Sequence, residues 1–191
     1  MSQHAGAISH RTTAALEAGL DEVRQAPADG GTVDLIIRRP VSGEREVLDE
    51  AVLDPAEGLV GDNWRERGSR HTPDGAAEPD RQLNIINARL SRLVAVDPER
   101  RALAGDQLHL DLDLSVANLP PGTQLALGSA VVEVTEPPHL GCDKFVARFG
   151  CEAMRFVNSA LGRELRLRGM CARVVVAGTV RPGDTVTKVR A

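Results

Sequence analysis

The residues best suited to chemistry in this 191-residue sequence lie in the stretch PPHLGCDKFVARFG, residues 137–150. Its two prolines end a predicted strand, and Cys142 follows a short turn at the point where a helix is expected to begin. Backbone N–H groups and the helix dipole favour a thiolate there, and His139, Lys144 and Arg148 are expected to add positive charge. Because a thiolate is both a nucleophile and a soft metal ligand, Cys142 is the candidate catalytic residue and metal ligand, with Lys144 and His139 as its catalytic partners.

An alternative stays open, because a free cysteine often packs in a core as a small apolar side chain. Cys171 adjoins a valine-rich strand and is expected in the core, and Cys151 follows Gly150 at a helical turn. Three cysteines without a C-x₂-C pair indicate neither a disulfide framework nor a structural zinc site.

Two further stretches hold candidate ligand-binding residues. In EGLVGDNWRERG, residues 57–68, the glycines permit unusual backbone geometry, and Asp62 could bind a ligand or simply stabilise a solvated turn. In GRELRLRGMCAR, residues 162–173, Arg166 and Arg168 would share a face if residues 165–168 are extended, and together they could bind a phosphate. The alternative is a set of surface arginines without a ligand.

The composition limits the class of protein. The net charge is −4 and aromatic residues make up only 2% of the chain, which argues against binding of nucleic acid. The N-terminus has no apolar signal region, and no run approaches the length of a membrane span, so a cytoplasmic protein without a membrane partner is expected.

The elements that must position these residues are mainly strands. Many short apolar runs with turn residues between them, one of which alternates with period two over residues 107–116, predict a mainly β domain that is closed or nearly closed as a barrel. The predicted strands lie in TVDLIIRRP (32–40), EREVLDEAVLD (44–54, one strand), QLHLDLDLSV (107–116), the hairpin QLALGSAVVEVTE (124–136) and CARVVVAGTVRPGDTVTKV (171–189).

Helices are expected in two places. In residues 11–25, Leu16, Leu20 and Val23 form one stripe, and Thr12 or Thr13 can cap the helix. Residues 143–161 are predicted to form two short helices divided at Gly150, with Phe145, Phe149, Phe156 and Ala160 on one stripe. Residues 64–81 are rich in glycine, proline and charge, and predict a long exposed loop.

Taken together and in order, GLVGDNW (58–64), GCDKFVARFG (141–150) and LRGMCARVVVAGTVRPGD (167–184) resemble the MOSC domain, a family named for the C-terminal domain of molybdenum cofactor sulfurase. The resemblance covers residues 32–191. It implies a MOSC-like β-barrel with the cysteine in a cleft at its edge. In residues 1–31, the polar residues 1–10 predict a disordered start, and the helix after them is expected to form an N-terminal appendage.

The resemblance also implies a function. Cys142 would carry sulfur received from a pyridoxal-phosphate-dependent cysteine desulfurase, or would bind a molybdenum–pterin cofactor. The cofactor-binding residues that the resemblance and the arginine pattern suggest are Gly61, Asp62, Arg148, Arg166, Arg168 and Gly169. Two alternatives remain: a molybdenum-dependent reductase of N-hydroxylated compounds, fed by an electron-donor reductase, and a non-catalytic binding barrel.

Overall fold

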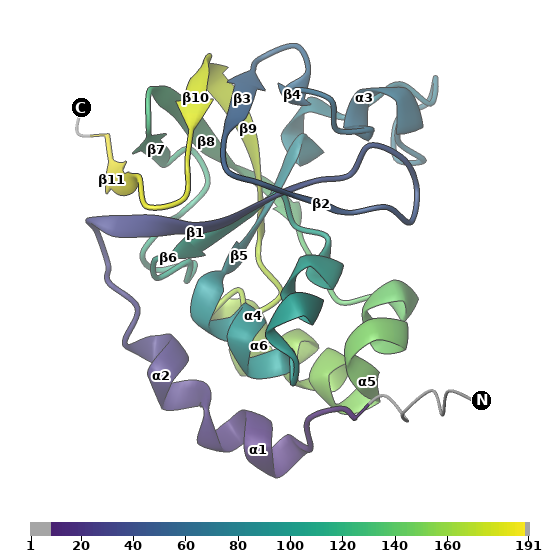
Figure 1. Ribbon diagram of the computed structural model, residues 1–191, viewed down its shortest axis with the longest axis vertical. Coiled ribbons are helices and arrows are strands. Elements are labelled where there is room, and N and C mark those ends of the chain that lie inside the picture. The colour runs from purple at the N-terminus through teal and green to yellow at the C-terminus, as the bar shows by residue number, and fades with distance from the viewer. Residues whose placement is uncertain (1–8, 190–191) are drawn as a thin grey trace, which may run out of the picture.

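The computed structural model describes residues 9–189, so residues 1–8 of the predicted disordered start lie outside the described residues. Seven strands form a closed barrel in the order β11-β7-β8-β9-β5-β6-β1, because β1 pairs with both β6 and β11. Their bounds are β1 Gly31–Arg38, β5 Leu83–Asn87, β6 Leu108–Asp111, β7 Gln124–Leu127, β8 Ala130–Pro138, β9 Met170–Val176 and β11 Thr185–Lys188. The mainly β barrel predicted from the alternating pattern is confirmed (Figure 1).

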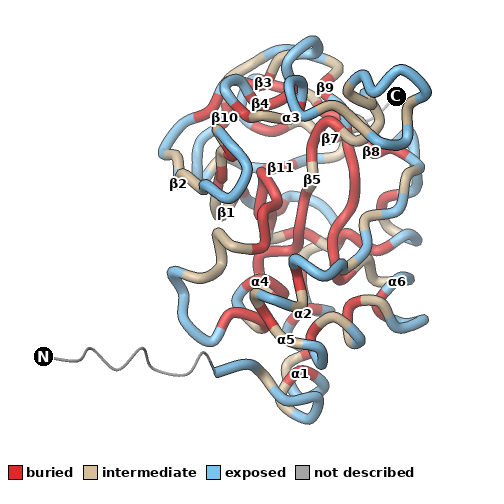
Figure 2. Tube along the Cα trace, turned by 90° about the vertical axis from the view of Figure 1, so that its right-hand side faces the viewer, coloured by how far each residue is buried: buried red, intermediate tan, exposed pale blue. Residues whose placement is uncertain are grey.

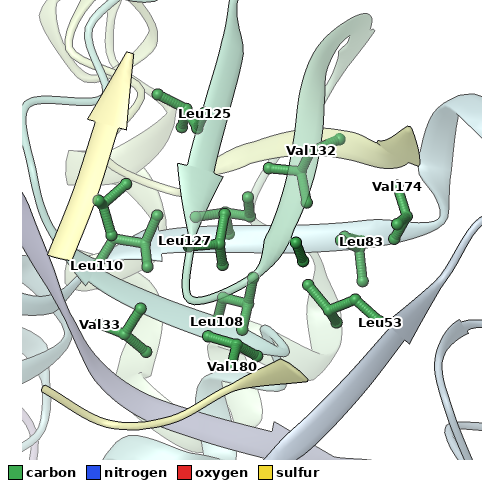
Figure 3. Close-up of a cluster of buried hydrophobic side chains, with 14 of the residues drawn as sticks. Val33, Leu53, Leu83, Leu108, Leu110, Leu125, Leu127, Val132, Val174 and Val180 are labelled. Carbon is green, nitrogen blue, oxygen red and sulfur yellow. The ribbon is translucent and has the colours of Figure 1, made fainter. Parts of the chain in front are cut away.

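Leucine and valine side chains fill the inside of the barrel, as a chain with so few aromatic residues requires. Figure 3 shows side chains from β1, β5, β6, β7, β8 and β9 pointing toward one another in this core. The four leucines expected on one face, Leu108, Leu110, Leu112 and Leu114, are all buried there. The predicted ten-residue strand is too long, however, since β6 ends at Asp111 and Asp113 then accepts hydrogen bonds from Ser115 in a turn.

Two other strand predictions meet different outcomes. The predicted hairpin is confirmed, with β7 and β8 joined through Gly128 and Ser129. The single strand predicted over residues 44–54 is wrong. It is divided into β2 (Glu46–Leu48), which pairs with β1, and β3 (Ala51–Asp54), which pairs with β4 (Gly58–Leu59) and β10 (Gly178–Val180) in a separate sheet.

A crossover that the sequence did not predict supplies the parallel pair of the barrel. β5 leads into α4 (Ala88–Val94) and the 3₁₀ helix η2 (Pro98–Ala104), and the chain returns as β6 alongside β5. Asn87 ends β5 and caps α4 by accepting hydrogen bonds from the N–H groups of Arg89 and Leu90. Because Ile85 faces the barrel core and Ile86 the helices, β5 joins the two apolar clusters of the protein.

All α-helices of the described chain except α3 gather at one end of the barrel (Figure 1). They are α1 (Thr13–Ala18), α2 (Leu20–Arg24), α4, α5 (Asp143–Asn158) and α6 (Ala160–Glu164). The N-terminal helix forms as predicted with Thr12 as its cap, but it breaks at Gly19, and its buried stripe packs on α5 and α4. Figure 2 shows the buried faces of these helices turned toward the strands.

Residues 64–81 are more ordered than a plain loop. They contain α3 (Trp64–Arg67) and the 3₁₀ turn η1 (Pro79–Arg81), and the Trp64 side chain is buried. No helix within residues 9–189 is both long and apolar enough to cross a membrane.

Gly150 divides α5, as predicted, with φ 88° and ψ 164°. The break changes the phase of the apolar stripe, so that Ala153 and Val157 continue the buried face, whereas Phe156 is only partly buried and Ala160 is exposed. The segment that carries Cys142 can therefore point in a different direction from the rest of α5.

We expect Gly150→Ala to lower the free energy of unfolding by about 1–3 kcal/mol, because this backbone region is nearly restricted to glycine. The added carbon would also lie 2.9 Å from Nδ1 of His10. Urea unfolding measures the loss. Gly122→Ala is the comparison variant, because its φ is also 88° but no atom lies within 4 Å of the new carbon. If Gly150→Ala is as stable as the wild type, the backbone conformation at residue 150 does not require glycine.

Candidate functional site

Cys142 lies on the surface at the N-cap position of α5, in the segment that connects β8 to this helix. Its carbonyl accepts hydrogen bonds from the N–H groups of Phe145 (2.8 Å) and Val146 (3.0 Å), which starts the helix. The predicted position at a helix start is confirmed. The alternative of a buried thiol fits Cys171 instead, whose pKa burial raises to about 11.

Three contacts hold the segment around Cys142. On one side, His139 hydrogen-bonds Asp106 through Nε2 at 2.8 Å. Next to the cysteine, the Asn158 side chain accepts from the N–H of Gly141 (2.8 Å) and donates to its carbonyl (3.0 Å). These contacts fix the backbone that presents the sulfur.

Arg168 connects both sides of the segment. Its Nη1 lies 2.8 Å from each carboxylate oxygen of Asp106, and its guanidinium stacks 5.0 Å from the ring centre of Phe145, three residues after Cys142. Burial alone would raise the pKa of Asp106, but the charge of Arg168 and the hydrogen bond to His139 together hold that pKa well below its usual range. Asp106 is thus a buried carboxylate that organises its neighbours.

The expectation that His139 adds positive charge is wrong. Burial, followed by repulsion from Arg168, lowers the pKa of His139, so its ring is neutral near pH 7. An ionised carboxylate only accepts hydrogen bonds, so Nε2 carries the proton that it donates to Asp106. His139 positions the cysteine segment and leaves Nδ1 as an acceptor.

Two hollows meet at Cys142. The larger one, about 620 Å³, lies between the cysteine, η1 and the segment 67–71, and we call it the main cavity. The smaller one, about 140 Å³, extends toward β1 and α5, and we call it the basic cavity. Both are lined by Arg67, Asn84, Cys142 and Lys144, so a ligand at the cysteine can occupy both.

Six cationic side chains and no acidic one line the basic cavity: Arg39, Arg45, Arg67, Lys144, Arg148 and Arg168. Arg39 and Arg168 are paired with buried carboxylates. The other four form no ion pair with any residue in the described range 9–189. Positive charge that the protein does not compensate therefore concentrates beside one exposed thiol.

The electrostatics of Arg45 and Arg148 show this crowding. Burial and then repulsion from Arg148 lower the pKa of Arg45. Burial also lowers the pKa of Arg148, against the opposing attraction of a Cys142 thiolate. The Nε of Arg45 is buried without a hydrogen-bond partner among the described residues. An anionic ligand in the basic cavity would supply the hydrogen-bond acceptor that this donor lacks.

The predicted site residues divide into two groups. Cys142, Lys144, His139, Arg148 and Arg168 are brought together at the two cavities. Gly61 and Asp62 do not line either cavity. Asp62 is buried and accepts two hydrogen bonds from the guanidinium of Arg39, at 2.8 and 2.7 Å, so it acts on the basic cavity through Arg39.

Arg166 and Gly169 also lie elsewhere. The premise that residues 165–168 are extended is wrong, because these residues form turns between α6 and β9. As a result Arg166 lines a separate hollow, while Arg168 is buried against Asp106. A side chain at Gly169 would lie 2.3 Å from the carbonyl of Ile85, so this glycine permits close packing of backbone on backbone.

Sequence reasoning missed Arg39, Arg45, Asn84 and Asp106, which all line or support the site. One available signal was the sequence RRP at residues 38–40, an arginine pair at the end of a strong strand. Among residues 9–189, no group of three or more His, Cys, Asp or Glu side chains could hold a metal ion.

No family model and no curated protein matches this chain at a significant level. Solved structures do match. YiiM from Escherichia coli is 20% identical with a TM-score of 0.54, over 84% of this chain and 70% of that one. The chain is therefore similar in fold to YiiM, which is consistent with a MOSC-like fold.

Two further structures share this MOSC-like fold. YuaD from Bacillus subtilis is 16% identical with a TM-score of 0.56, over 84% of this chain and 97% of that one. YiiM from Geobacillus stearothermophilus is 12% identical with a TM-score of 0.51, over 85% and 74%. At these identities the likeness concerns the fold, so the chemistry must be argued from the side chains.

Proposed function

We propose that the protein binds a molybdenum–pterin cofactor, with the Cys142 thiolate as the protein's ligand to the metal. The observation that carries this proposal is the group of four cations without carboxylate partners, Arg45, Arg67, Lys144 and Arg148, around the cavities that Cys142 shares. The MOSC-like fold supports the same conclusion.

The side chains fit such a group in three respects. A thiolate is a soft ligand, suited to a metal that is already chelated by sulfur. A phosphate carries close to two negative charges near pH 7, and the basic cavity offers it arginine donors, including the unpartnered Nε of Arg45. The main cavity, at about 620 Å³, lies within the size range of ligand pockets and can take the ring system.

Each residue of the chain then has its own task. Arg45 and Arg148 hold the phosphate, and Lys144 lines both cavities together with the thiol. Asp106 and Arg168 hold the segment 139–145 in place through their contacts with His139 and Phe145. Asn158 fixes the backbone of Gly141. The cofactor would supply the redox chemistry, and an electron-donor reductase would be its partner.

Sulfur carriage is a second candidate, favoured by the exposure of Cys142. The Cys142 thiolate could attack the outer sulfur of a persulfide carried on a cysteine of a pyridoxal-phosphate-dependent cysteine desulfurase. A new S–S bond would then form at Cys142, the donor's S–S bond would break, and the donor cysteine would leave as a thiolate. The same cations would stabilise a negatively charged terminal sulfur.

The proposed cofactor is tested by purifying the protein without oxygen from cells that make the cofactor and are supplied with molybdate. Metal analysis and pterin fluorescence are expected to give equal molar amounts of molybdenum and pterin. A protein with neither would contradict cofactor binding, and mass spectrometry of Cys142 after exposure to a desulfurase would then decide on sulfur carriage. If no persulfide forms either, both candidates fail.

The basic cavity gives a prediction that needs no cofactor. We expect the purified protein to bind inorganic phosphate, and Arg45→Ala to weaken that binding about tenfold, because one charge-assisted hydrogen bond is lost. Isothermal titration calorimetry measures the affinity. Arg155→Ala is the control, since Arg155 is exposed on α5 and lies outside the basic cavity. Equal affinities of the two variants would speak against a phosphate subsite at Arg45.

A further inference from the structure

A third hollow, about 400 Å³, lies beside the strand end Pro137–Pro138 and α6, and we call it the rear cavity. It shares only His139 with the main cavity and only Arg168 with the basic cavity, so it is separate from the cysteine. Its walls are mostly apolar and include Leu140, Val157 and Met170. A cavity of this size with apolar walls can enclose a small organic molecule.

Arg166 supplies the polar feature of the rear cavity. Its Nη1 donates a hydrogen bond to the carbonyl of Leu119 at 2.6 Å and lies 3.8 Å from the sulfur of Met170. Its Nε and Nη2 have no hydrogen-bond partner, and no carboxylate lies within ion-pair distance, among residues 9–189. A guanidinium that is partly removed from water without a counterion is a place where an anionic group would bind.

The backbone conformation of Arg166 also indicates that its side chain has a function. Its φ is 46°, and within the described chain no other residue except glycines has a positive φ. Glycine or asparagine would adopt this conformation with less strain than arginine. Strain of this kind is tolerated where the side chain has a task, and here the side chain lines the rear cavity.

The charges around the rear cavity select a monoanion. Arg163 and Arg166 bring two positive charges, the exposed Glu136 brings one negative charge, and Arg168 is compensated by Asp106. His139 is neutral near pH 7, because burial lowers its pKa. The net charge of one suits a carboxylate better than a doubly charged phosphate.

We propose that the rear cavity binds a small apolar monocarboxylate, whose carboxylate pairs with the free Nε and Nη2 of Arg166 and whose hydrocarbon part lies against Leu140, Val157 and Met170. The proposal does not depend on the chemistry at Cys142. His139 forms a wall of both the rear and the main cavity, so binding in one is expected to be sensed at its ring.

Octanoate is the probe, titrated into the wild-type protein by calorimetry, with 1-octanol as its uncharged counterpart. Octanoate is expected to bind and to shift the imidazole NMR signals of His139. Arg166→Gly removes the guanidinium and suits the positive φ, so the variant is expected to fold and to bind octanoate at least about tenfold more weakly. If Arg166→Gly does not fold, Arg166→Met gives the same expectation.

Cys142→Ser is expected to bind octanoate like the wild type, which separates this proposal from the proposed cofactor site. The proposal is overturned if octanoate does not bind the wild type, if octanol binds as tightly as octanoate, or if loss of the guanidinium leaves the affinity unchanged.

Discussion

Cys142→Ser is expected to reduce bound molybdenum more than about 100-fold, while the chain folds as before. Removal of a direct ligand exceeds the 10- to 100-fold effects typical of residues that only support a ligand. Serine does not ionise near neutral pH and is a poor ligand for a soft metal. Its folding effect is small, because Cys142 is exposed at an N-cap position that serine favours. Metal analysis after anaerobic purification measures the ratio of molybdenum to protein.

Cys151→Ser is the matched control for this experiment. Cys151 is also exposed and lies on the same helix, beyond the break at Gly150, but it lines neither the main nor the basic cavity. The control is expected to keep the molybdenum content of the wild type. If Cys142→Ser retains the metal, the Cys142 thiolate is not the ligand. If both variants lose the metal equally, the loss arises during purification and not from the substitution at Cys142.

Asp106→Asn is expected to lower the free energy of unfolding by about 3–5 kcal/mol, because it leaves the charge of Arg168 buried without a partner. Asparagine keeps the size of the side chain, so no cavity adds to the loss. Arg168 has only 8% of its side chain exposed, and water cannot replace the missing carboxylate. Urea unfolding with a two-state fit gives the difference.

Asp111→Asn is the comparison variant, because Asp111 pairs with Arg89 at 2.7 Å where both side chains are partly exposed. The loss there is expected to be about 0–1 kcal/mol. If Asp106→Asn lowers the free energy of unfolding by no more than Asp111→Asn does, the buried pair of Asp106 and Arg168 does not support the cysteine segment.

The loss of stability in Asp106→Asn depends on pH, and the sign of this dependence follows from the lowered pKa of Asp106. A carboxylate with a lower pKa in the folded than in the unfolded state stabilises the fold above its unfolded pKa, about 3.9, and loses this contribution as the pH falls below it. The stability difference between wild type and Asp106→Asn should therefore be full at pH 6 and shrink below about pH 4.

Local patterns in the sequence predicted the elements that depend on neighbouring residues. Alternation and the Gly128–Ser129 turn predicted the hairpin of β7 and β8, and the turn before Cys142 predicted the start of α5. Residues 44–54 misled because apolar residues lie on both sides of Asp49 and Glu50, although the chain changes sheets there. Periodicity reports which residues face a core, but not which sheet they join.

The basic cavity could not be predicted in the same way, because segments that are distant in the sequence build it. Arg39 and Arg45 follow β1, Arg67 ends α3, and Arg148 lies on α5, and nothing in the spacing of these residues relates them. Asp106 is equally hidden, since its partners His139 and Arg168 lie far along the chain. A resemblance to a family could name the cysteine, but the charges around it depend on tertiary contacts.

The pairing of β1 with β11 also has a meaning for how the protein is made. Gly31 lies opposite Val186 and Thr32 opposite Thr185, so the barrel closes only when its earliest and latest strands meet. On the ribosome, β1 would keep an open edge until β11 has left the exit tunnel. Such edges are templates for joining other chains, and contacts so distant in sequence form slowly. Nascent chains are therefore expected to aggregate when the protein is synthesised at a high rate. Slower synthesis is expected to give more soluble protein.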